Sequence, residues 1–85
     1  MIDVRNILDN LAPYIPIHLD PHMSLEKRTR TIGKGPSRKD FARELNMDMY
    51  NLNLRISRGS VPYEEILDYC IACDIPMKTI FTKKV

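Results

Sequence analysis

Proline and glycine divide this 85-residue chain into short segments, which limits the length of any helix that it can form. Pro13 and Pro76 each interrupt an apolar pattern, and Gly59 follows the longest stretch free of both residue types, residues 37–58. Within the segments, apolar residues recur three and four positions apart, the spacing of helices that bury one face. A chain of this length forms one small domain. We therefore predict an all-α fold of four to five short helices in a single domain, residues 1–85.

The first predicted helix covers residues 2–11. Asp3 is suited to cap its N-terminus. Pro13 ends it, because proline cannot continue a helix and restricts the residue before it. The apolar stripe of this helix consists of Val4, Ile7, Leu8 and Leu11.

Residues 12–36 are the least regular part of the sequence. They hold four of the six prolines and two of the three glycines, and they sustain no apolar period. A compact domain seldom carries so long a connection unless it is functional, partly structured or disordered. Residues 14–19 alternate loosely, as extended chain does, and residues 24–27 favour one turn of helix. We predict an irregular insertion between the first helix and the segment that begins at Ser37.

Helical patterns return at Ser37. Ser37 and Asp40 have the spacing of a capping box, with aspartate where Glu or Gln is usual. The helix that follows ends at Asn46, a residue type that tolerates the left-handed backbone used to leave a helix. Asp48 is suited to cap a second helix, and Gly59 ends it. The apolar face of the first of these two helices consists of Phe41, Ala42 and Leu45.

These two helices have the spacing of a helix-turn-helix. Ala42 is small enough to let the helices cross closely, and Asn46 follows four residues later, in the turn. Leu52, six residues after Asn46, packs back from the second helix. We predict a helix-turn-helix over residues 37–59, with a recognition helix near residues 48–58.

Two further helices are predicted after Gly59. Ser60 to Pro62 open the first, with the proline in its first turn, where its missing N–H costs nothing. Pro76 then separates it from a last short helix. The stripe of the longer helix consists of Tyr63, Ile66, Leu67, Cys70 and Ile71, and that of the short one of Met77, Ile80 and Phe81.

The segment after Asn46 resembles a known family. The run from Asn46 to Cys70 is similar to the DNA-binding domain of the bacteriophage CI-type repressors, whose recognition helix leads into an element like Arg58-Gly59-Ser60-Val61-Pro62-Tyr63-Glu64-Glu65. Tyr69-Cys70 matches a pair in the family's next helix, and residues 75–82 resemble its closing short helix. The resemblance covers about residues 37–82, and residues 12–36 have no counterpart in it.

This chain departs from the family at two further positions. Asn46 stands where glycine is usual, and Arg55 where a large apolar residue is common. The resemblance implies a transcriptional regulator, expected to be a repressor, that binds duplex DNA as a homodimer. A homodimer is expected because one recognition helix rarely gives adequate affinity alone.

The recognition helix reads base edges from its outward face. With Leu52 and Ile56 turned inward, the candidate base-reading residues are Met49, Tyr50, Asn51, Asn53, Leu54 and Ser57. Asn51 and Asn53 are the best specificity candidates, because an amide can pair with adenine through two hydrogen bonds. The candidate phosphate contacts are Arg38, Lys39, Arg55, Arg58 and Lys34. Alternatively, the asparagines belong to a solvated helix face, Tyr50 lies against the core, and Leu54 contacts a partner or nothing.

Charge is unevenly distributed although the net charge is only +2. Residues 27–43 carry seven bases against one acid, and residues 64–74 carry four acids and no base. One phosphate-facing side would give this pattern, and so would two solvated faces of opposite sign. The basic residues 27–34 are suited to an arm that reaches DNA phosphates or the minor groove. Two other interpretations of the insertion stay open: residues 14–19 add to a protein partner's surface, or the insertion is a solvated flexible loop.

Other classes of function have weaker support. No nucleophile motif or phosphate-binding loop is present, so we expect no enzyme. Cys70-x-x-Cys73 and His18-x3-His22 have the ligand types of a zinc site, but Cys70 lies on an apolar stripe and Pro21 separates the histidines, so we expect no metal and no cofactor. No apolar run could span a membrane and no signal peptide is apparent, so we expect a cytoplasmic protein. The main alternative function is a protein-interaction module on the same fold.

Overall fold

The computed structural model describes residues 3–83, so residue 2 of the predicted first helix lies outside the described residues. The described chain is helical and contains no strand, which confirms the all-α prediction. Its elements are α1 (Val4–Leu11), the 3-10 helix η1 (Ala12–Tyr14), α2 (Leu25–Lys34), α3 (Arg38–Glu44), α4 (Met49–Arg58), α5 (Tyr63–Ala72) and α6 (Met77–Ile80).

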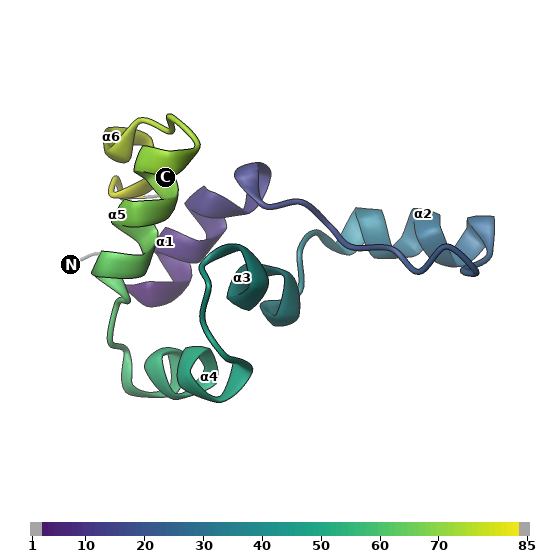
Figure 1. Ribbon diagram of the computed structural model, residues 1–85, viewed down its shortest axis with the longest axis horizontal. Coiled ribbons are helices and arrows are strands. Elements are labelled where there is room, and N and C mark those ends of the chain that lie inside the picture. The colour runs from purple at the N-terminus through teal and green to yellow at the C-terminus, as the bar shows by residue number, and fades with distance from the viewer. Residues whose placement is uncertain (1–2, 84–85) are drawn as a thin grey trace.

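Five of the α-helices surround one apolar core, and α2 alone buries none of its residues. Leu52 of α4 and Ile66 of α5 are completely buried in that core, and α1 packs against both α4 and α6. Figure 1 shows these five helices as a compact body, with α2 projecting from it. The core consists of Val4, Ile7, Leu8, Leu11, Ile15, Phe41, Ala42, Leu45, Leu52, Ile66, Tyr69, Cys70, Ile75 and Ile80.

Side-chain caps fix where four helices begin. Asp3, Ser37 and Asp48 each accept a hydrogen bond from the backbone N–H three residues later, as their positions predict. Ser24 caps α2 in the same way. The predicted capping box is confirmed, because the Asp40 carboxylate also accepts the Ser37 N–H at 3.0 Å.

Three helices end in a left-handed residue. Asn46 (φ 55°), Gly59 (φ 69°) and Asp74 (φ 55°) follow α3, α4 and α5 closely. At each end, the N–H one residue beyond the left-handed position bonds a carbonyl five residues back, as in a Schellman motif. These bonds join Met47 to Ala42 (2.8 Å), Ser60 to Arg55 (2.9 Å) and Ile75 to Cys70 (2.8 Å). The turn predicted at Asn46 and the helix end predicted at Gly59 are therefore confirmed.

The predicted face of α5 is correct at Ile66 and Cys70 but wrong at Tyr63 and Ile71, so the buried face is rotated from the predicted one. Tyr63 and Ile71 are 56% and 69% exposed, whereas Tyr69 is buried with Ile66 and Cys70. Tyr69 faces inward because its hydroxyl donates to the Tyr14 carbonyl at 2.8 Å, a contact with a distant segment that α5 alone does not reveal. Pro62 lies at the N-cap, just before the first turn in which it was predicted.

Most of the insertion is more regular than predicted. Residues 25–34 form the ten-residue helix α2 instead of a single turn, and this helix is the one beyond the predicted four to five. It was missed because it has no apolar stripe facing the core, although Ser24 and Gly35 (φ 79°) mark its ends. We call residues 16–35 the arm. In Figure 1 an extended segment runs outward and α2 returns beside it, which accounts for the 40 Å long axis of a molecule 26 and 25 Å across in the other directions.

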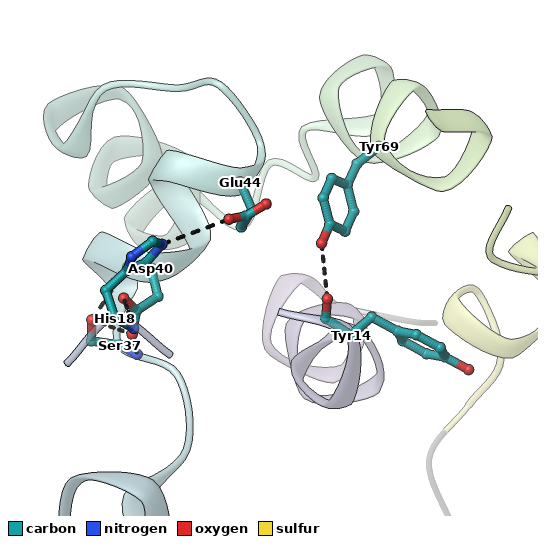
Figure 2. A network of polar contacts seen from close by, with 6 residues as sticks. All are labelled: Tyr14, His18, Ser37, Asp40, Glu44 and Tyr69. Atoms are coloured by element: carbon teal, nitrogen blue, oxygen red, sulfur yellow. Dashed lines mark hydrogen bonds and ion pairs between the residues drawn. The ribbon is translucent and has the colours of Figure 1, made fainter. Parts of the chain in front are cut away.

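Polar contacts from α3 fix the base of the arm (Figure 2). The buried Asp40 carboxylate accepts the His18 N–H at 3.3 Å in addition to its capping bonds from Ser37. The His18 ring lies 3.7 Å from the Glu44 carboxylate. Burial raises the pKa of Asp40, but the hydrogen bonds from Ser37 and His18 outweigh it and leave the pKa below its ordinary value.

The lowered pKa of Asp40 predicts how the free energy of unfolding changes with pH. The ionised carboxylate stabilises the fold above the ordinary aspartate pKa of 3.8, and this stability is lost as the pH falls through the lower, folded-state value. Asp40→Asn is expected to lower the free energy of unfolding at pH 7 by about 1–3 kcal/mol and to flatten its fall in acid, measured by urea unfolding at several pH values. Asp68→Asn, at an exposed position on α5, is the control. An acid dependence unchanged in Asp40→Asn would contradict the assignment.

Candidate nucleic-acid interface

Helices α3 and α4 form the helix–turn–helix unit of the body. Residues 45–48 connect them, and α3 packs against α4 (Figure 1). Ala42 and Leu52 are both buried at this crossing, as predicted, and Met47 and Ile56 pack at the edge of the core. Because both ends of the turn are fixed by hydrogen bonds, the outward face of α4 is held firmly relative to α3.

The candidate base-reading residues differ in exposure. Tyr50 is 77% exposed, so it does not lie against the core. Ser57, seven residues later on the same side of the helix, is exposed as well. Asn51, Asn53 and Leu54 are half-buried. Met49 is 39% exposed, although it lies three residues before Leu52 and seven before Ile56, because it begins the helix. Met49 is thus exposed at the first position of α4, at the edge of the inward stripe, and its base-reading role stays a prediction.

One hydrogen bond joins the two helices on their outer side. Arg38 Nη1 donates to Asn53 Oδ1 at 2.9 Å, which brings a predicted phosphate contact onto a predicted base reader. The bond occupies one of five guanidinium donors and one lone pair of the amide oxygen. Both groups therefore keep hydrogen-bonding capacity for a ligand, and the positive charge of Arg38 lies beside the middle of α4.

The other predicted phosphate contacts fall in two places. Lys39 is exposed in the first turn of α3, and Arg55 and Arg58 lie in the last turn of α4, half-buried and exposed respectively. Lys34 is apart from them, exposed at the end of α2 on the arm. Within residues 3–83, no carboxylate lies within 4.0 Å of any of these cations or of Arg38. Among the described residues, no carboxylate therefore forms an ion pair with these cations.

Sequence reasoning missed Arg5 as a member of this surface. Arg5 is exposed on α1 and lines two neighbouring open pockets, one with Arg38 and the other with Ser57 and Arg58. Arg5 therefore lies between Arg38 at the start of α3 and Arg58 at the end of α4. Its only signal in the sequence was a charged residue between Val4 and Ile7 of an amphipathic helix, which is unremarkable without the packing.

Negative charge gathers elsewhere on the molecule. A pocket between the α3–α4 turn and α5 is lined by Glu44, Glu65 and Asp68. Burial, the side chain of Cys73 and the charge of Glu44 raise the pKa of the adjacent Tyr69 to about 12. The pocket that contains Arg5 and Arg38 also contains Asp9 and has two bases against one acid, whereas the pocket that contains Glu44, Glu65 and Asp68 has three acids and no base.

Cys70 and Cys73 are free thiols, the first buried and the second exposed. Burial and the neighbouring Cys73 raise the pKa of Cys70 above its ordinary value. In the part of the chain that the structure describes, no group of three or more His, Cys, Asp or Glu side chains is placed to hold a metal ion. Across the same residues, no helix has the length and apolar character needed to cross a membrane.

In comparisons with known proteins, the chain matches no family model, no curated protein and no solved structure. The similarity to CI-type repressors therefore stays a prediction that rests on residues 37–82 themselves. Helices α3 and α4 and the exposed cations around them, which have no carboxylate of residues 3–83 within 4.0 Å, form the candidate interface.

The outer contact between α3 and α4 is expected to contribute little to stability. Arg38→Met and Asn53→Ala should each change the free energy of unfolding by less than about 0.5 kcal/mol, because surface substitutions seldom change it more. Leu52→Ala should cost about 2–5 kcal/mol, since it leaves a cavity in the core. Thermal and urea unfolding measure all three. If Arg38→Met proved as destabilising as Leu52→Ala, Arg38 would be part of the scaffold and not of an interface.

Proposed function

We propose that the protein is a transcriptional regulator that binds duplex DNA sequence-specifically, with α4 in the major groove. The observation that carries the proposal is the Arg38–Asn53 hydrogen bond at 2.9 Å. It joins a cation at the start of α3, with no carboxylate of residues 3–83 within 4.0 Å, to a polar side chain on α4. A phosphate contact next to a base-edge contact is the arrangement that a helix-turn-helix uses to hold its recognition helix in register.

The polar residues of α4 have complementary roles in this proposal. Because Arg38 donates to the Asn53 oxygen, the Asn53 amide N–H groups stay available to major-groove acceptors such as purine N7, guanine O6 or thymine O4. Asn51 and Ser57 add further hydrogen-bonding groups, and the exposed Tyr50 ring can meet a thymine methyl or donate to a phosphate.

Cations on both sides of α4 would hold the DNA backbone. Arg38 and Lys39 lie in the first turn of α3, where free backbone N–H groups also favour a phosphate. Arg58, with Arg5 beside it, serves the opposite end of α4, and Arg55 lies within the last turn. Such contacts carry no sequence information, so they should make the affinity depend steeply on salt.

The wider biological role follows from the resemblance to CI-type repressors. We propose repression, a homodimer on a two-fold related site, and action in the cytoplasm. Two copies are needed for high affinity, because a single small module buries little surface on DNA.

A protein-interaction module on the same fold is the second candidate. The pocket lined by Glu44, Glu65 and Asp68 and the exposed Tyr50 favour it, because acidic hollows and exposed aromatic rings suit protein partners better than phosphates. Binding of DNA at low salt separates the two candidates.

The direct test is selection of a binding site from random duplexes, followed by affinity measurements on the selected and a scrambled duplex. Asn51→Ala and Asn53→Ala should each weaken binding to the selected duplex by about 1–3 kcal/mol and leave the scrambled duplex almost unaffected. Thr79→Ala, exposed on α6, is the control and should change neither affinity.

Two results would contradict the proposal. Equal losses on both duplexes would remove the base-reading roles of Asn51 and Asn53. Failure to bind any duplex at low salt would remove DNA binding itself and favour the protein-interaction module.

A further inference from the structure

We propose that the arm is a second DNA-binding element, in which one flank of α2 binds backbone phosphates beside the site read by α4. The inference rests on the proposed DNA binding of α3 and α4 and extends it to a part of the chain that has no counterpart in the CI-type resemblance. It depends on three observations: the arm is internally braced, its cations lie on one flank, and its base is fixed to α3.

Bracing within the arm gives α2 a defined position. A ten-residue helix with no buried residue is only marginally stable by itself. Here the half-buried Arg28 donates from Nε to the Met23 carbonyl (3.2 Å) and from Nη2 to the Pro21 carbonyl (2.9 Å). The Ser24 cap adds a third contact at the tip. The arm therefore has a defined structure, and Arg28 stabilises the arm itself instead of being available to a ligand.

The remaining cations of α2 lie on one flank. Lys27, Arg30 and Lys34 are spaced at i, i+3 and i+7, which places them on the same side of a helix. All three are exposed, and none lies within 4.0 Å of a carboxylate of residues 3–83. Such a row, about 10 Å long for the seven residue steps from Lys27 to Lys34, matches neighbouring phosphates on one DNA strand.

The base of the arm keeps this row next to the proposed interface. His18 is held by Asp40 and Glu44, both on α3 (Figure 2). Lys34 precedes Arg38 by four residues, so their Cα atoms can be at most about 14 Å apart. Because Arg38 and Lys39 are proposed phosphate contacts, Lys34 brings the row of cations on α2 close to them along the chain.

A second copy of the chain is the competing occupant of the arm. Leu25 and Ile32, on the other flank of α2, are 81% and 55% exposed and could pair with a partner's arm. Two aliphatic side chains are far short of the roughly 1,000 Å² that a specific protein interface needs. Pairing of two arms through Leu25 and Ile32 would also leave the three cations on the opposite flank of α2 without a ligand. The charges therefore favour DNA.

The test measures the affinity of two double-lysine variants for a generic DNA duplex over a range of salt concentrations. Lys27→Gln/Lys34→Gln should lower the slope of log affinity against log salt by about 1 to 2, since each lost phosphate contact removes roughly 0.9. Lys78→Gln/Lys83→Gln removes the same charge from exposed positions on α6 and after it, and should leave the slope unchanged. Leu25→Ser/Ile32→Ser should also keep the slope and the mass measured by sedimentation.

Each other outcome has a distinct meaning. If the two lysine pairs behave alike while Arg38→Met lowers the slope, the arm does not bind DNA although the helix-turn-helix does. A wild-type dimer that becomes a monomer on Leu25→Ser/Ile32→Ser would overturn the assignment in favour of a second copy. If the wild-type protein binds no duplex at all, the proposed function itself fails.

Discussion

The buried carboxylate of Asp40 organises the two parts of the molecule. It completes the capping box with Ser37, which fixes the start of α3, and it accepts the His18 N–H, which fixes the base of the arm. A charge that is only 6% exposed is tolerable because these hydrogen bonds replace the water that it loses. The helix-turn-helix and the arm thus share one anchor, and the position of each follows from that of α3.

The turn between α3 and α4 fixes the position of α4 relative to α3. Asn46 takes the left-handed conformation, the Met47 N–H bonds back to Ala42, and Asp48 caps the next helix. Leu52 then locks α4 onto the core. A surface proposed to recognise DNA needs this rigidity, because specificity depends on holding the base-reading side chains in fixed positions relative to the bases.

Local chemistry explains which parts of the fold were predictable. The caps at Asp3, Ser37 and Asp48 and the end at Gly59 depend on residues within a few positions, so the sequence alone shows them. The rotation of α5 was not predictable, because it depends on a bond between Tyr69 and Tyr14, 55 residues apart. Arg5 at the candidate site and the Arg38–Asn53 contact likewise exist only through packing. The full length of helix α2 was not predicted, because apolar periodicity detects only helices that bury a face.

The central claim is that α3 and α4 present a DNA-binding surface, and amide NMR during a titration with generic duplex DNA tests it most directly. At low salt we expect shifts concentrated at Arg38, Lys39 and residues 49–58, and we expect them to fade as salt is raised, because phosphate contacts are screened. Absence of shifts at low salt, or shifts that gather at the pocket lined by Glu44 and Asp68 instead, would contradict the account.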